Sequence, residues 1–269
     1  MNFIQAFILG AVQGLTEFLP VSSSGHLVLF QRIFGLKENV LTFDIAVHIA
    51  TMLAVIVVFW KDILGILKRP FAKMTWLLVI GTLPAVIVGL MLKKAIERLF
   101  EGGQTLGLEF IATGMVLWFV ESVRKGNKNI DRTSPLDALW IGIAQAVAIL
   151  PAVSRSGLTI AGALFRGLNR EFAAKFSFLL SIPAILGATI LDVPDALHTI
   201  RASGTVGVPT ACLILGVLTA LVFGFIAIKW MLQILTRGSL RGFAVYVILL
   251  GLLILVDQLF LGKWFELLW

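Results

Sequence analysis

Long apolar stretches dominate the chain and set its predicted architecture. Six of them are each long enough to cross the hydrocarbon core of a bilayer, which takes about 20 helical residues. They lack the alternation of apolar and polar residues that is typical of membrane barrels, and backbone in lipid must satisfy its own hydrogen bonds. The pattern therefore predicts an all-α integral membrane protein. The predicted spans cover residues 39–60, 75–95, 106–122, 171–192, 207–229 and 242–262.

Two further apolar stretches, residues 1–34 and 135–168, are each interrupted midway by Pro, Ser and Gly residues. Non-helical backbone at membrane depth is tolerated only where protein or a water-filled cavity surrounds it. Each stretch is therefore predicted to form a re-entrant pair of helices with a break between them.

The two broken stretches are similar to each other at a constant offset of 132 residues. Three predicted spans separate them, and an odd number of spans inverts the second copy relative to the first. We therefore predict a single membrane domain, 1–269, built from inverted repeats 1–122 and 135–262, with its functional site where the two breaks meet. The matching pairs are Gly10 and Gly142, Gln13 and Gln145, Val21 and Val153, Ser22 and Ser154, Ser24 and Ser156, and Gly25 and Gly157.

Composition and charge agree with a membrane protein. Apolar residues make up 59% of the chain and charged residues 14%, with a net charge of +7. The Lys and Arg residues lie in short loops and form no stripe, so we expect anionic lipid headgroups and no nucleic acid as partners. The loops assigned to the cytoplasm, which lie within 61–74, 124–132, 166–175 and 229–241, carry 14 Lys and Arg residues. The opposite side carries 7, namely Arg32, Lys37, Lys93, Lys94, Arg98, Arg201 and Lys263, so the positive-inside rule places both termini outside. A single cysteine, Cys212, excludes an intramolecular disulfide, and no cleaved signal sequence is expected.

An acid lies within the first broken stretch. Glu17 follows Gln13 by one helical turn, so the two side chains share a face of the helix. A carboxylate at a helix centre costs about 2.5 to 3.5 kcal/mol on insertion scales, which makes an intramembrane acid a functional candidate. The alternative is that Glu17 is a polar cap before the break at Pro20.

Hydroxyl side chains and a histidine follow this break, where the second half-helix starts. The free N–H groups and positive dipole end of a helix start favour an anion, and hydroxyls can cap the helix or contact a phosphoryl oxygen. His26 is close in sequence to Ser23 and Glu17, so we predict a functional role for it rather than a structural one. The predicted substrate contacts here are Ser22, Ser24 and Gly25, and the candidate catalytic residues are Ser23 and His26.

The second break contains Arg155, which is the sharpest indication of the ligand. A guanidinium stays charged in any protein environment, and its planar fork suits the oxygens of a phosphate or pyrophosphate. The alternative is a structural ion pair with Glu17, which would also bring the two breaks together. Nearby hydroxyls predicted to bind substrate belong to Ser154, Ser156 and Thr159.

A further pair, Asp44 and His48, lies four residues apart in the first predicted span. Two ligands at this spacing are weak evidence for a metal without a third, so a hydrogen-bonded pair is the preferred interpretation.

The run QGLTEFLPVSSSGH from Gln13 to His26 and the run PAVSRSGLT from Pro151 to Thr159 together resemble the bacterial undecaprenyl-diphosphatase family of the bacitracin-resistance type. The likeness extends along nearly the whole chain. Gln13 and Glu17 satisfy the family's first motif, which is Glu or Gln, three residues, then Glu. Its second motif is Pro-Gly-x-Ser-Arg-Ser-x-x-Thr, from which this chain departs at Ala152.

The resemblance implies removal of the terminal phosphate from undecaprenyl pyrophosphate in the bacterial plasma membrane, which recycles the lipid carrier of cell-wall synthesis. It also implies a divalent metal and a pocket open toward the periplasmic side. Its implied fold, six spans and two re-entrant pairs in an inverted repeat, agrees with the pattern described above. The sequence leaves the oligomeric state open, and a homodimer is one expectation.

These residues suggest a mechanism. We expect Arg155 and its neighbouring hydroxyls to bind the pyrophosphate, while Glu17, helped by Gln13, holds Mg²⁺ or Ca²⁺. Ser23 would then attack with His26 as its base. Two alternatives stay open, in which His26 is itself phosphorylated or activates a water.

Two other functions compete with hydrolysis. Inverted repeats with broken helices are also a common plan of transporters, so a polyprenyl-phosphate transporter or flippase is the main alternative. The set of Ser, His, Arg and Glu side chains favours hydrolysis, because carriage needs only binding groups. A phosphatidic-acid-phosphatase type is disfavoured. Ser24 to His26 match the Ser-Gly-His element of that class, but its distant Arg/His/Asp motif is not found in this sequence.

Overall fold

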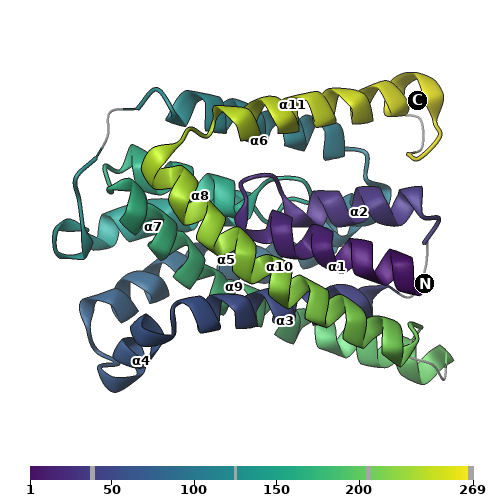
Figure 1. Ribbon diagram of the computed structural model, residues 1–269, viewed down its shortest axis with the longest axis horizontal. Coiled ribbons are helices and arrows are strands. Elements are labelled where there is room, and N and C mark those ends of the chain that lie inside the picture. Colours follow the sequence, from purple (N-terminus) through teal and green to yellow (C-terminus); the bar gives the residue numbers. More distant parts are fainter. Residues whose placement is uncertain (37–39, 124–125, 204–206, 266–269) are drawn as a thin grey trace.

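The computed structural model describes residues 1–36, 40–123, 126–203 and 207–265, and in these ranges every regular element is a helix. Figure 1 shows the arrangement. The α-helices are α1 (Phe3–Phe18), α2 (Ser23–Ile33), α3 (Leu41–Val58), α4 (Trp60–Lys68), α5 (Lys73–Gly102), α6 (Leu106–Val120), α7 (Pro135–Val147), α8 (Arg155–Phe165), α9 (Arg170–Ser203), α10 (Thr210–Arg237) and α11 (Arg241–Val256); a 3₁₀ turn, η1 (Ile130–Arg132), and a π-helix, η2 (Asp257–Leu261), complete the fold.

The predicted all-α membrane class is confirmed. Among the described residues, five helices are long and apolar enough to cross a membrane, namely α3, α5, α9, α10 and α11, and they coincide with five of the six predicted spans. The remaining prediction, 106–122, corresponds to α6, an apolar helix of only 15 residues. Residue 39, where the first predicted span starts, lies outside the described residues.

Both broken stretches form two helices joined by a turn, as their Pro, Ser and Gly residues predict. Each stretch also starts in the same way. Asn2 caps α1 and Ser134 caps α7, and in both cases the third helical residue, Gln5 or Asp137, bonds back to the cap. Such a capping box satisfies N–H groups that have no partner within the helix.

The two broken stretches pack against long helices of the other half (Figure 1). In α1, a Cβ added at Gly10 would lie 2.5 Å from the carbonyl oxygen of Gly216 in α10. In α7, a Cβ added at Gly142 would lie 2.5 Å from the carbonyl oxygen of Gly81 in α5. Small residues let helix backbones approach this closely in a membrane, where hydrophobic burial gives no drive to associate. Helices α6 and α11 run side by side along one face of the molecule (Figure 1).

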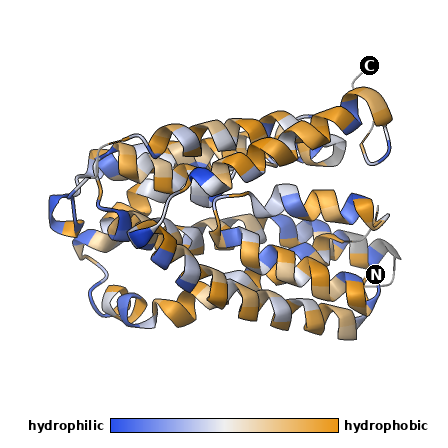
Figure 2. Cartoon of the chain, turned by 45° about the horizontal axis from the view of Figure 1, so that its top comes forward, coloured by the Kyte–Doolittle hydropathy of each residue, from blue (hydrophilic) through white to orange (hydrophobic). Residues whose placement is uncertain are grey.

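Charged loops gather at one end of the molecule. Segments 61–73, 128–132, 166–170 and 237–241, which carry most of the predicted cytoplasmic charge, lie at the end opposite the two termini (Figure 1). Figure 2 shows hydrophilic residues in the loops at this end and hydrophobic residues along the outer helices. Lys37, Arg124 and Lys125, which also belong to the predicted charge pattern, lie outside the described residues.

One fully buried acid ties this end together. The carboxylate of Asp137 accepts from Lys128 Nζ at 3.0 Å and from Arg166 Nε at 2.8 Å. It also accepts from the backbone N–H of Ser134 at 2.9 Å. Burial alone would raise the pKa of Asp137, but the Ser134 N–H and the two cations bring it down to about 2. The carboxylate is therefore charged at neutral pH and links the loop before α7 to the end of α8.

Candidate active site

The first break starts where α1 ends. Pro20 has no N–H to continue the helix, and Val21 N–H instead donates to the Leu19 carbonyl at 2.8 Å. Ser22 then caps α2, with its hydroxyl accepting from Gly25 N–H at 3.3 Å. The last turn of α1 therefore carries Glu17 directly to the start of α2.

The second break has the same construction. α7 ends at Val147, and Ser154 caps α8 by accepting from Gly157 N–H at 3.0 Å. Arg155 is the first residue of α8, so its guanidinium belongs to a helix start, where anions are favoured. The capping pairs in the two breaks are the residues that match at the offset of 132.

The two breaks contact each other across the centre of the molecule. Ser22 Oγ donates to the Pro151 carbonyl at 3.3 Å, and Ser156 Oγ donates to the Leu19 carbonyl at 2.9 Å. Gly25 lies so close to the second break that an added Cβ would be 3.0 Å from the Cβ of Ala152. Segments more than 120 residues apart in the sequence are therefore in contact, and the two breaks meet as predicted.

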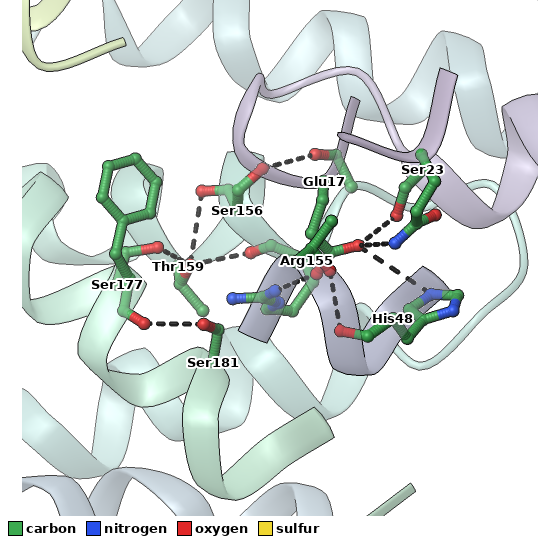
Figure 3. Close-up of polar contacts among 12 residues, drawn as sticks. Glu17, Ser23, His48, Arg155, Ser156, Thr159, Ser177 and Ser181 are labelled. Carbon is green, nitrogen blue, oxygen red and sulfur yellow. Dashed lines mark hydrogen bonds and ion pairs between the residues drawn. The ribbon is translucent and has the colours of Figure 1, made fainter. Parts of the chain in front are cut away.

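Glu17 is at the centre of this site (Figure 3). Its side chain is buried, and Oε1 forms an ion pair with Arg155 Nη2 from the second break. Oε2 accepts from Ser23 Oγ at 2.6 Å and from Gln13 Nε2 at 3.0 Å. The ion pair between Glu17 and Arg155, weighed as a structural alternative, is thus present, and it brings the predicted catalytic groups together.

His26 lies apart from this cluster. Its Nδ1 contacts the Ser22 carbonyl at 2.7 Å and its Nε2 contacts Tyr246 Oη at 2.8 Å. Neither ring nitrogen is hydrogen-bonded to Ser23, whose hydroxyl instead donates to Glu17. The geometry therefore pairs Ser23 with a carboxylate and not with the predicted histidine.

A small cavity lies between the breaks. Its volume is about 30 Å³, which is room for one or two water molecules and less than a pyrophosphate needs. Glu17 and Arg155, which form the ion pair, both lie in the wall of this cavity. The lining residues are Thr16, Glu17, Ser22, Ser23, Ser24, Ala148, Val153, Ser154, Arg155 and Ser156.

Several predicted site residues do not line the cavity. Thr159 Oγ1 contacts Ser177 Oγ of α9 at 2.6 Å and the Arg155 carbonyl at 2.7 Å (Figure 3). It therefore links the start of α8 to α9. The N–H of Gly25 donates to the hydroxyl of Ser22. Gln13 contacts the cavity only through Glu17.

Asp44 and His48 are hydrogen-bonded, as preferred, but through the backbone carbonyl of Asp44 and not through its carboxylate. His48 Nδ1 donates to the backbone carbonyl of Asp44 at 2.7 Å, while the Asp44 carboxylate accepts from Gln31 at 2.7 Å. The two side chains therefore do not bond to each other. His48 Nε2 instead lies 3.9 Å from Glu17 Oε2, beside the site.

Two residues of α6 hold the second break and were not predicted. Glu109, buried in an apolar helix, accepts from Ala152 N–H at 2.6 Å. One turn later, Thr113 Oγ1 accepts from Ser154 N–H at 3.1 Å. Glu109 could have been found by the criterion that singled out Glu17, because it is also an acid within an apolar run.

Comparison with known proteins identifies the family of this chain. The helical membrane fold and the paired breaks belong to a recognised class: residues 6–253 match the family of the bacitracin resistance protein BacA, and the chain belongs to this family. It is 54% identical over 258 residues to an undecaprenyl-diphosphatase of Carboxydothermus hydrogenoformans, covering 96% of this chain and 98% of that protein.

Other relatives are matched over nearly their whole length and have the same kind of name. The chain is 48% identical to undecaprenyl-diphosphatase 3 of Bacillus cereus over 96% of its length, and 38% identical to an undecaprenyl-diphosphatase of Halothermothrix orenii over 95%; 98% of each relative is covered. The family predicted from the two motifs is therefore confirmed.

Proposed function

We propose that this protein hydrolyses undecaprenyl pyrophosphate to undecaprenyl phosphate and inorganic phosphate within the membrane. Its relatives are named undecaprenyl-diphosphatases, and the similarity covers 98% of each of them. The observation that carries the proposal is the buried contact of Glu17 with both Ser23 and Arg155, which combines a nucleophile, a proton acceptor and an anion-binding group. A transporter or flippase would need the binding group but not a serine hydroxyl bonded to a carboxylate.

In the proposed reaction, Ser23 Oγ attacks the terminal phosphorus and its proton passes to Glu17. The bond to the bridging oxygen breaks, and undecaprenyl phosphate leaves. Water then hydrolyses the phosphoserine, which releases phosphate and restores the hydroxyl. The hydrogen bond of 2.6 Å from Ser23 to Glu17 supports this assignment, because a base must reach the proton it removes. Direct attack by water on the same phosphorus is the alternative.

Arg155 neutralises charge on the transferring phosphoryl group. Its Nη2 is paired with Glu17, while Nη1 is buried and has no hydrogen-bond partner among the described residues. A buried donor without a partner is costly, so an incoming phosphate oxygen gains a strong contact there. The hydroxyls of Ser22, Ser24, Ser154 and Ser156 are the further substrate contacts we propose, with Gly25 and Thr159 shaping the two helix starts.

Two neighbouring side chains, Gln13 and Glu17, are candidate ligands for a divalent cation. Gln13 Oε1 is buried and has no hydrogen-bond partner in the described part of the chain. Nε2 of the same side chain donates to Glu17. We propose that Gln13 and Glu17 hold Mg²⁺ or Ca²⁺ through oxygen atoms, the ligands these ions prefer. A bound cation would supply charge neutralisation to the pyrophosphate.

We also propose that the chain is an inverted repeat of residues 1–122 and 135–262, with six spans and two re-entrant pairs. Support comes from features that recur in both stretches: the capping box, the serine that caps the second half-helix, and the glycine contact with a long helix. These pairs are Asn2 with Ser134, Ser22 with Ser154, and Gly10 with Gly142.

The orientation in the bacterial plasma membrane follows from charge. The basic loops lie at the end opposite the termini, and the positive-inside rule assigns that end to the cytoplasm. We propose that the site opens toward the periplasmic side and that the lipid tail stays among membrane lipids. A homodimer remains a prediction, since the structure contains a single chain.

One assay tests the proposed function. Purified full-length protein in detergent is given undecaprenyl pyrophosphate with Mg²⁺ or Ca²⁺, and released phosphate is measured with and without a chelator. We expect one phosphate per lipid in the presence of metal and a loss of activity with chelator. Absence of release would contradict hydrolysis and favour the transporter, and release that is indifferent to the chelator would contradict the metal site.

A further inference from the structure

Helix α11 contributes one polar group to the site region. Tyr246 is the only tyrosine in the chain and the only polar side chain of α11 after Arg241. Its hydroxyl contacts Nε2 of His26 at 2.8 Å, and the two rings stack at 20° with their centroids 5.7 Å apart. The rest of α11 is apolar, so this contact is the polar link between α11 and the first break.

His26 is held from three sides. It is 2% exposed, and its ring lies perpendicular to that of Phe110 in α6, with the ring centroids 5.3 Å apart. A backbone carbonyl can only accept, so Nδ1 carries the proton that is donated to the Ser22 carbonyl, and Nε2 accepts from Tyr246 O–H. With both nitrogens engaged, the ring has no lone pair directed at Ser23.

The carbonyl that His26 holds belongs to an unusual residue. Ser22 has φ 69° and ψ 101°, and among the described residues it is the only non-glycine with a positive φ. Such a conformation persists only where the surrounding structure enforces it. The Ser22 carbonyl accepts twice from His26, from the backbone N–H at 3.2 Å and from Nδ1 at 2.7 Å. The next residue is Ser23.

We propose that Tyr246 and His26 are positioning residues for the nucleophile. Tyr246 fixes the tautomer and orientation of His26, and His26 holds the strained turn at Ser22. This turn places Ser23 Oγ within hydrogen-bonding distance of the Glu17 carboxylate. The inference rests on the proposed hydrolysis by Ser23 and assigns His26 a role that requires a hydrogen-bond donor toward Ser22 and no proton transfer with substrate.

The test compares steady-state hydrolysis of undecaprenyl pyrophosphate by wild type, Tyr246→Phe, His26→Gln and His26→Ala, each as the full chain in detergent. Glutamine keeps an N–H donor but cannot act as a base or a phosphate acceptor near neutral pH. We expect His26→Gln to retain activity within about tenfold of wild type and His26→Ala to lose about 100-fold or more, because a misplaced nucleophile is that costly. Tyr246→Phe should lower kcat by about 3- to 10-fold, the value of one hydrogen bond, with KM unchanged.

Leu253→Ala, on the exposed face of the same helix, is the matched control and should behave as wild type. Elution as a monodisperse peak shows that each variant is folded. A folded His26→Gln that is as inactive as His26→Ala would overturn the proposal, because a hydrogen-bond donor on this side chain would then not be sufficient for activity. Wild-type kcat in Tyr246→Phe would overturn it as well. Inactive wild type would instead contradict the proposed function itself.

Discussion

Glu17→Gln is expected to reduce turnover of undecaprenyl pyrophosphate by about 10³-fold, within the range by which a general base accelerates proton transfer. The glutamine keeps the shape of the side chain but is a far weaker proton acceptor for Ser23, and it removes the charge that pairs with Arg155. Because the phosphate contacts of Arg155 remain, KM should change much less than kcat. Phosphate release by the purified variant measures both constants.

The matched control for this substitution is Glu121→Gln. Glu121 and Arg170 form a second ion pair at 2.7 Å, and their side chains are 13% and 16% exposed, close to the burial of Glu17 and Arg155. If a buried ion pair mattered only for stability, both substitutions would lower the yield of folded protein and leave turnover per folded molecule intact. Turnover by Glu17→Gln within tenfold of wild type would remove Glu17 from the proposed chemistry.

Arg155→Ala is expected to lower kcat/KM by about 10³-fold or more, because an arginine that neutralises a transferring phosphoryl group contributes about 10³ to 10⁵ in rate. The same change leaves Glu17 buried without its cationic partner, which costs about 3 to 5 kcal/mol of stability. Arg155→Lys keeps the charge but loses the planar fork, so it should recover only part of the loss.

Separating these two effects requires a stability control. Arg170→Ala breaks the comparable pair with Glu121 and should destabilise the protein while sparing the kcat/KM of the molecules that remain folded. Melting temperature and kcat/KM are therefore measured on the same preparations. The account fails if Arg155→Ala loses only stability and keeps its kcat/KM.

Local signals in the sequence were sufficient for the breaks and their contact. Pro20 stops a helix, a serine starts the next one, and the repetition of this order around Ser154 indicates a second copy. An acid in one copy and an arginine in the other cannot remain unpaired in lipid, so their proximity follows from electrostatics. The structure places these two side chains in contact.

The residues that hold the breaks could not be predicted from local sequence. Tyr246 lies 220 residues from His26, and nothing near it in the chain indicates a polar partner. Closeness in sequence also suggested that His26 serves Ser23. The ring instead packs between α6 and α11, because α2 turns that side chain away from the cavity. Such contacts depend on tertiary packing, which a sequence pattern does not specify.

The central claim is that the two breaks hold one diphosphate between them. It is tested most directly by a structure of the protein bound to a methylene-bridged diphosphonate analogue of the lipid, which cannot be hydrolysed. We predict that the Arg155 guanidinium contacts the phosphonate oxygens and that Ser23 Oγ lies within about 3.5 Å of the terminal phosphorus, in line for attack. A headgroup bound elsewhere, with the contact of Glu17 and Arg155 intact and the cavity between the breaks still closed, would contradict the account.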